Sequence, residues 1–347
     1  MNRFLAAALI SLPVALALSA GCSPSHDAAP TDPTVTDPDQ LQAPAAGLGF
    51  QFKTQLFPVN AGDEIQNCYF YRVGDLAKAG GMPEGEAINL HRIRIVQKAG
   101  SHHMNIFRVR TIVNLDPTKG PVQEGKNGVG ECFKSSNWAD WPLVANTQQS
   151  GDLDWTFPDG VANVFQPDEW LMLQTHYVNA TTQKTPAKAK VLVNFNFPKA
   201  LPAHELSTLF ATNQNIRVCP GESDKSFTKT CQFPTSGVHV IAANGHFHSR
   251  GTLFQMMPTD QQGTVGDVFY TSTSWDDPPM TRDIDIVLPD NGGVQWKCTF
   301  DAPVGSCGNP ADSCCFTFGG HVDTQEHCNA FVYYWGDNVN PASINCF

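Results

Sequence analysis

The segment GSHHMN, residues 100–105, contains two adjacent histidines, His102 and His103, whose imidazole nitrogens are candidate metal ligands. Neighbouring side chains of a flat strand point to opposite faces of the sheet, so a regular strand would keep the two rings apart. Either one of the two histidines has an ordinary role, or the backbone bends here and brings both rings to one side. The flexible AGS segment before them would permit such a bend. Met104 is expected to pack in the core and is not assigned to a metal.

A second pair of histidines, His246 and His248, is separated by a single residue in GVHVIAANGHFHSRG. On a strand this spacing places both rings on one face, close enough to bind one ion. A solvent-facing pair is the alternative, but the surrounding residues are mostly apolar, and buried imidazoles need partners. The zinc-hydrolase pattern HxHxD fails because Arg250 stands where the aspartate belongs. A cupin would need a glutamate that SRGTLF lacks.

Two further histidines complete the candidate set. His176 ends the apolar run WLMLQTHYVN, where, taken by itself, a satisfied core histidine is the simpler interpretation. His327 precedes Cys328 and the hydrophobic run NAFVYYW. If His327 instead pointed to solvent, His321 in FGGHVD or a water molecule would take its place as a ligand.

The segments that carry these histidines read as strands. From Leu48 onward, short runs such as INLHRIRIVQ, NIFRVRTIVN and AKVLVNFNFP are rich in β-branched and aromatic residues, with Gly, Pro, Asn or Asp at most joins. Long helical periodicity is absent. The pattern predicts an all-β protein built from antiparallel sandwiches or barrels, for which we choose two β-sandwiches. Prolines in NFPKALPAHEL place a boundary near residue 200, which gives domains at residues 48–200 and 201–347.

Composition narrows the class of protein. The chain has 347 residues and a net charge of −11, with no basic stripe, which excludes a nucleic-acid partner. Residues 1–22 predict an export signal that ends at Cys22, where the preceding small residues resemble a bacterial lipoprotein signal. Simple secretion with cleavage nearby is the alternative. Residues 23–47 predict a flexible tether. We therefore expect an exported, lipid-anchored or secreted protein whose other ten cysteines form up to five disulfides.

The order of the histidine motifs is informative as a whole. HHM, then THY, then HxH and a final position before CN resembles the copper type II, ascorbate-dependent monooxygenase family, which includes peptidylglycine α-hydroxylating monooxygenase and dopamine β-monooxygenase. SGVHVIAANGHFHSRG, LQTHYVNAT and CNAFVYYW also read like segments of that family. The resemblance implies two antiparallel jelly-roll β-sandwich domains that face each other across a cleft, with one copper ion in each.

The resemblance also implies roles for individual residues. An electron-transfer copper would be bound by His102, His103 and His176, and a catalytic copper by His246, His248 and His327. The implied disulfides are Cys68–Cys132, Cys219–Cys346 and Cys298–Cys328, which leaves Cys231, Cys307, Cys314 and Cys315 to pair within a loop.

The chain departs from the family pattern at its third catalytic ligand and in its substrate contacts. His327 stands where the family has methionine, and imidazole suits both copper oxidation states whereas a thioether favours Cu(I). Asn244 replaces an arginine and Phe331 a tyrosine, while Asn329 is kept. A peptide carboxylate would therefore lack its charged partner.

These observations lead to a functional expectation. We expect a monooxygenase with two copper ions per chain that hydroxylates a C–H bond of an unknown small or peptidic substrate. It would use O₂ and an external reductant such as ascorbate. A non-catalytic copper-binding surface protein, for storage or sensing, is one alternative. An adhesion sandwich with incidental histidines is another.

Overall fold

The computed structural model describes residues 40–98, 100–110, 122–124, 141–147, 152–179, 187–339, 344 and 346. The chain from Val35 onward clusters into one compact unit. The predicted export signal and residues 23–39 of the predicted tether lie outside the described residues.

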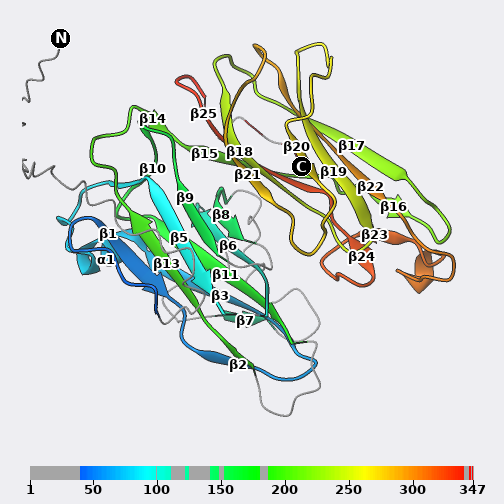
Figure 1. The fold of residues 1–347 in the computed structure, drawn as a ribbon, viewed down its shortest axis with the longest axis horizontal. Helices are drawn as coiled ribbons and strands as arrows, with labels where there is room; N and C mark the ends of the chain where they lie inside the picture. Colours follow the sequence, from blue (N-terminus) through cyan, green and yellow to red (C-terminus); the bar gives the residue numbers. More distant parts are fainter. Residues whose placement is uncertain are drawn as a thin grey trace, which may run out of the picture. The chain divides into compact units, whose positions relative to one another are not determined.

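Strands dominate this unit, and nearly all neighbouring strands are antiparallel, so the predicted all-β class is confirmed (Figure 1). Helical structure is limited in the described residues to short pieces such as α1 (Val73–Ala79) and the 3₁₀ turn η5 (Pro310–Asp312). The parallel pairs are β10–β14 and β23–β24.

The sheets of the first part of the unit combine strands that are distant in sequence. In spatial order the strands are β1 (Gly49–Lys53), β13 (Val191–Asn196), β5 (Arg92–Gln97) and β9 (Leu153–Thr156); β14 (His204–Glu205), β10 (Val161–Phe165) and β4 (Ile88–Leu90); β7 (Val122–Glu124), β3 (Glu64–Arg72), β11 (Trp170–Val178), β6 (Ser101–Val109) and β8 (Leu143–Thr147); and β12 (Ala187–Ala189) with β2 (Phe57–Val59).

The second part of the unit contains three further sheets. Their strands, again in spatial order, are β15 (Ser207–Thr212), β25 (Asn329–Trp335), β18 (His239–His246) and β21 (Met280–Val287); β16 (Arg217–Val218), β23 (Phe316–Phe318) and β24 (Gln325–Glu326); and β17 (Lys225–Gln232), β22 (Gly293–Phe300), β19 (Gly251–Thr259) and β20 (Tyr270–Ser272).

The described residues form two large apolar cores and a small third cluster of Leu41, Val96 and Leu192. Of the two large cores, the larger is built mostly from the strands before residue 200, and the smaller from the strands after it. However, Ile241 and Tyr333, from β18 and β25, belong to the larger core, and the rings of Tyr333 and Trp155 lie 4.9 Å apart between centroids. Apolar contacts thus cross the predicted boundary, and the division into domains at residue 200 stays a prediction.

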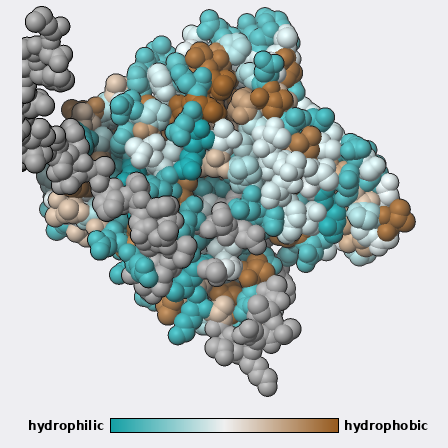
Figure 2. All heavy atoms as spheres, in the orientation of Figure 1, coloured by the Kyte–Doolittle hydropathy of each residue, from teal (hydrophilic) through white to brown (hydrophobic). Residues whose placement is uncertain are grey.

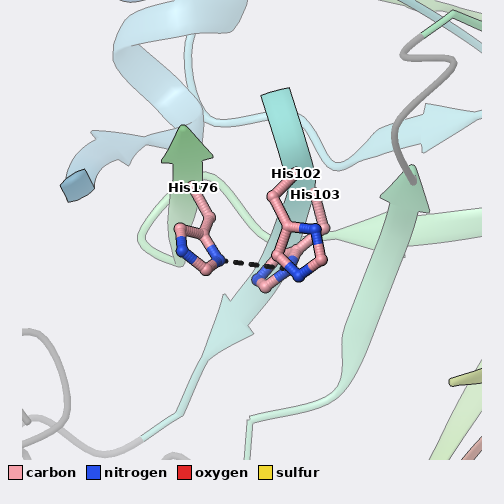
Figure 3. Close-up of side chains that lie close together, drawn as sticks. All are labelled: His102, His103 and His176. Carbon is pink, nitrogen blue, oxygen red and sulfur yellow. Dashed lines mark hydrogen bonds between the residues drawn. The ribbon is translucent and has the colours of Figure 1, made fainter. Parts of the chain in front are cut away.

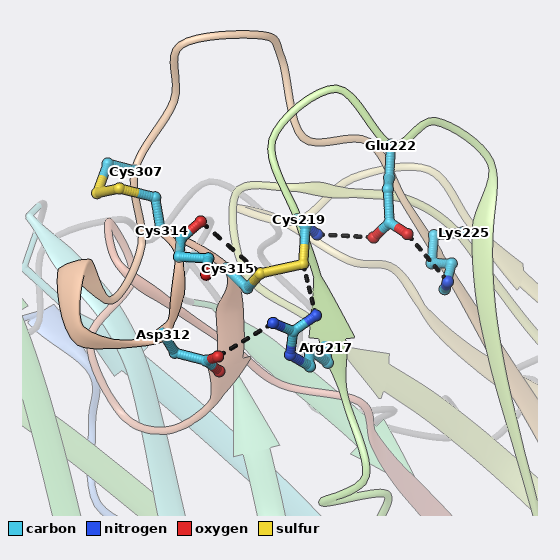
Figure 4. Close-up of a disulfide and its surroundings, with 9 residues drawn as sticks. Arg217, Cys219, Glu222, Lys225, Cys307, Asp312, Cys314 and Cys315 are labelled. Atoms are coloured by element: carbon cyan, nitrogen blue, oxygen red, sulfur yellow. Dashed lines mark hydrogen bonds and ion pairs between the residues drawn. A yellow bond between two sulfur atoms is a disulfide. The ribbon is translucent and has the colours of Figure 1, made fainter.

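Disulfides hold several loops of the second part (Figure 4). The described residues form the disulfides Cys219–Cys315, Cys231–Cys346, Cys298–Cys328 and Cys307–Cys314. The prediction of Cys298–Cys328 is confirmed. The prediction of Cys219–Cys346 is wrong, and of the four cysteines expected to pair within a loop, only Cys307 and Cys314 do so. Cys68 is also disulfide-bonded, and its predicted partner Cys132 lies outside the described residues.

Strand register explains the pairing of Cys219. The two-residue strand β16 pairs antiparallel with β23, and Val218 lies opposite Phe316. The residues that continue this ladder are Cys219 on one side and Cys315 on the other, so their sulfurs meet. Arg217 donates to Cys219 Sγ at 2.7 Å and forms an ion pair with Asp312 (Figure 4).

The disulfides indicate folding in an oxidising environment, as predicted for an exported protein. A search of the described residues finds no helix with the length and apolar character needed to cross a membrane. The face shown in Figure 2 is mostly hydrophilic or intermediate in hydropathy, and its apolar residues form scattered groups.

Candidate metal centres

The first histidine cluster consists of His102, His103 and His176, which lie on the neighbouring strands β6 and β11 (Figure 3). His176 pairs with His103, but the next residue, Tyr177, pairs with Ser101, so His102 is an extra residue in the ladder. This β-bulge turns His102 toward the same side as His103. One nitrogen from each of the three rings lies within 4.8 Å of the others. The predicted backbone irregularity is therefore present, and both adjacent histidines reach one cluster.

Glu64 orients one ring of the first cluster. His176 Nε2 donates to Glu64 Oε1 at 2.7 Å, which leaves His176 Nδ1 facing His103 Nδ1 at 3.4 Å. A carboxylate in this role fixes the tautomer and the orientation of a ligand histidine. The hydrogen bond from His176 holds the pKa of Glu64 below its ordinary value.

The two adjacent histidines are uncharged at neutral pH. Burial, followed by the neighbouring charge of His176, lowers the pKa of His102 to about 3. The same causes lower the pKa of His103 well below its ordinary value. Neutral imidazoles have the free lone pairs that a metal requires.

The second histidine cluster consists of His246, His248 and His327, with one nitrogen from each ring within 4.8 Å of the others. His246 is the last residue of β18, and His327 follows the last residue of β24. Between the first two, Phe247 is buried in the smaller apolar core. The alternation predicted for the HxH motif therefore holds. His321, the alternative ligand, is exposed and lies outside the cluster.

A buried carboxyl group holds the backbone of the second cluster. Glu326 is fully buried and accepts the backbone N–H groups of His248 at 3.0 Å and of Arg250 at 2.9 Å. Burial raises the pKa of Glu326 to about 8. His248 Nδ1 lies 3.0 Å from the carbonyl oxygen of Gln325, and donation there leaves Nε2 as the ligand atom.

Unpartnered nitrogens in the second cluster test whether a metal would fit. His246 Nδ1 and His327 Nδ1 are buried and have no hydrogen-bond partner among the residues that the structure describes. Burial, then the charge of His248, lowers the pKa of each ring well below its ordinary value. Leaving buried polar atoms unpaired is costly, and a bound ion would satisfy them. Three neutral imidazoles suit copper and zinc.

Both clusters line one cavity of about 370 Å³. The ring centroids of His103 and His246 lie 6.1 Å apart across it. Carboxamides and phenylalanines supply much of the remaining lining, namely Gln66, Asn105, Asn146, Gln174, Asn329, Phe107, Phe210, Phe318 and Phe331. No carboxylate, ammonium or guanidinium group belongs to the described part of this lining.

The predicted substrate contacts lie in two different places. Asn329 and Phe331 line the cavity, and Phe331 stacks on Phe210 with ring centroids 5.1 Å apart. Asn244 does not line the cavity, and its amide donates to the carbonyls of Pro278 and Pro279. No motif in the sequence marks Glu64 or Glu326 as supports of the clusters.

Comparisons with known proteins found no matching family model and no matching curated protein. The solved structures that match include viral capsid proteins. The major capsid protein P2 from bacteriophage PM2 is 8% identical, with a TM-score of 0.30, over 84% of this chain and 98% of that chain. The infectious bursal disease virus VP2 subviral particle is 8% identical, with a TM-score of 0.23, over 87% of this chain and 77% of that chain.

These comparisons correct the family expected from the sequence. The prediction of membership in the copper type II monooxygenase family is wrong, because no family model or curated protein supports it. The capsid structures do not support it either. Their low TM-scores carry no argument about function, which depends on the site itself.

Proposed function

We propose that this protein binds two copper ions, one at each histidine cluster, and hydroxylates a C–H bond of an organic substrate with O₂ and an external reductant such as ascorbate. The observation that carries the proposal is the presence of two three-histidine clusters on one cavity. The proposal rests on this geometry and not on membership of a family.

The composition of the cavity favours copper over zinc. Zinc hydrolases commonly use a carboxylate as general base, and the described lining of this cavity contains none. Among divalent ions, sites rich in nitrogen bind copper most tightly. When bound, copper supplies the one-electron chemistry that activates O₂, which amino-acid side chains do not provide.

The chain's own residues would bind the metal ions, orient the ligand rings and shield part of the cavity from water. Glu64 directs His176 Nδ1 into the first cluster, and the carbonyl oxygen of Gln325 directs His248 Nε2 into the second. The phenylalanines of the lining exclude water from part of the cavity. The ring centroids of His103 and His246 lie 6.1 Å apart, and this short separation would favour electron transfer between ions bound at the two clusters.

The proposal is tested by metal analysis and O₂ consumption. We expect two copper ions per chain in the purified, copper-supplemented protein, and O₂ uptake with ascorbate that rises when a substrate is added. A protein that takes up zinc in preference to copper, or that binds neither metal, contradicts the proposal.

A non-catalytic copper-binding role is the second candidate. The observation that favours it is the imidazole of His327 in the second cluster, because an all-imidazole site binds Cu(II) well and is harder to reduce. Two bound copper ions with no O₂ uptake, across reductants and a broad set of substrates, would select this role.

We also propose that Cys22 carries a lipid anchor at the cell envelope. The small residues of LSAGC and the export-like segment before them support this proposal. The Cys22→Ala variant should move from the membrane fraction to the soluble fraction. Unchanged fractionation would contradict the anchor and leave the copper proposal untouched.

A further inference from the structure

A row of four carboxamides crosses the sheet that carries the first histidine cluster. We call Gln66, Gln174, Asn105 and Asn146 the carboxamide row, and they lie on the adjacent strands β3, β11, β6 and β8. Asn146 Nδ2 donates to Asn105 Oδ1, Asn105 Nδ2 donates to Gln174 Oε1, and Gln174 Nε2 donates to Gln66 Oε1. The three donor–acceptor distances are 2.5, 2.7 and 2.8 Å.

The hydrogen bonds of the carboxamide row all point in one direction across the sheet, and the row forms part of the cavity lining. Its bonds all run from β8 toward β3, so each amide is held in place by its neighbour. All four members line the cavity with the histidines. An amide nitrogen has two N–H groups, and among the described residues the hydrogen bonds of the row use only one on Gln174 and none on Gln66. The row therefore presents neutral hydrogen-bond donors to a ligand.

Phenylalanines supply the apolar part of the same lining. Phe210 and Phe331 are directly opposite each other on β15 and β25, and their rings are stacked with 15° between their planes. Phe318 adds a third ring, which lies 5.1 Å from His327 between centroids. Flat aromatic surfaces suit a planar or alkyl group of the ligand.

The described lining offers no charged partner for a ligand. A charged group that enters a partly desolvated cavity loses its hydration, and no side chain of the described lining supplies an opposite charge that would repay that cost. We infer that the substrate is a neutral molecule with a planar or apolar body and an amide-like hydrogen-bonding group. This inference rests on the proposed function, since it takes the cavity as the substrate site.

Three ligands of nearly the same shape test the inference: benzamide is neutral, benzoate is an anion and benzamidine is a cation. Binding is measured by calorimetry on the full chain, as purified and after copper removal by chelation. In the chelated protein, benzamide should bind about tenfold more tightly than either ion. In the purified protein it should still bind more tightly than benzamidine.

The result in the chelated protein decides the inference. Equal or tighter binding of benzoate or benzamidine there would overturn it, and so would the absence of binding by all three. Copper content and O₂ uptake of the same preparation decide the proposed function separately. If the protein prefers benzamide but does not bind copper, the proposed function fails. If it binds copper but does not prefer benzamide, the inference about the substrate fails.

A charge variant sharpens the test. Gln66→Glu keeps the oxygen that accepts from Gln174 and adds a negative charge at the end of the carboxamide row. It should strengthen benzamidine binding about tenfold and weaken benzoate binding. The matched control is Gln262→Glu, in an exposed loop outside the cavity lining, which should leave all three affinities unchanged. An equal effect of both substitutions would contradict the role of the row, and the wild-type comparison stands whether or not the variant folds.

Discussion

The two histidine clusters offer similar ligands but are built in different ways. The first depends on strand register: a bulge in a continuous sheet presents His102 and His103, and a neighbouring strand contributes Glu64 behind His176. That carboxylate has a side chain 49% exposed. The second cluster gathers residues from the ends of β18 and β24. A buried carboxyl group and the Cys298–Cys328 disulfide hold that region together.

The difference shows that two kinds of scaffold can hold three histidines close together. Register alone suffices where a broad sheet provides the scaffold. Where the ligands sit at strand ends, extra bonds must fix the backbone, because a free turn would cost conformational entropy on binding an ion. Each of the two clusters should therefore be sensitive to different substitutions, and the following predictions distinguish the two clusters on that basis.

Removing ligands should have the largest effect. The double substitution of His102 and His103 by alanine should remove one copper ion and leave the other, because the clusters share no ligand. Metal analysis and the Cu(II) electron paramagnetic resonance spectrum measure this. Loss of both ions, or of neither, would contradict two separate sites. The matched control is alanine at His91, which lies outside both clusters.

Removing the disulfide beside His327 should have the second-largest effect. Replacing Cys298 and Cys328 together by alanine should lower the free energy of unfolding by about 2–4 kcal/mol. It should also weaken copper binding at the second cluster only, because Cys328 adjoins His327. Denaturant unfolding and copper titration measure the two effects. Equal weakening of both clusters would show that the disulfide supports the whole fold rather than one site.

A reciprocal pair of substitutions tests the two supporting carboxyl groups. Glu326→Gln should weaken copper binding at the second cluster by about 10–100-fold, and Glu64→Gln should do the same at the first. In Glu326→Gln, one of two backbone N–H groups loses its acceptor. Competition with a copper chelator measures each affinity. If either variant weakens the cluster that it does not contact, the assignment of supports is wrong.

The His327→Met substitution should have the smallest effect. A thioether favours Cu(I). The reduction potential of copper bound at the second cluster should therefore rise by about 60 mV for each tenfold gain in affinity for Cu(I) relative to Cu(II). X-ray absorption of the reduced variant should show a copper–sulfur contact that the native protein lacks. His176→Met is the matched control in the first cluster. Copper–sulfur scattering in the native protein would mean that a methionine elsewhere is the ligand.

The sequence predicted what depends on local pattern. Alternation and turn residues indicated the all-β class, and HxH spacing indicated that His246 and His248 share a face. Neither pattern contains the register between distant strands. Glu64 supports His176 only because β3 and β11 pair with Gln66 opposite His176, which places Glu64 at the diagonal position.

The same limitation explains the disulfide error and the misplaced Asn244. Cys219 meets Cys315 through a two-residue strand that is too short to leave a periodic signal. Asn244 was assigned by analogy of position, and the register of β18 directs its amide to the carbonyls of Pro278 and Pro279. The two histidine sets were predicted without register, because the order of their motifs along the chain resembles that of a known family.

The adjacent cysteines Cys314 and Cys315 bear on the order in which the protein matures. Each joins a different disulfide, and the chain that follows them enters β23, whose Phe318 packs on His327 and lines the cavity. In a reducing compartment, that stretch would be held by its short ladders with β16 and β24. We expect the wall beside the second cluster to be completed only after oxidation. Premature loading with copper inside the producing cell would then be disfavoured more at the second cluster than at the first, whose histidines lie within a five-stranded sheet.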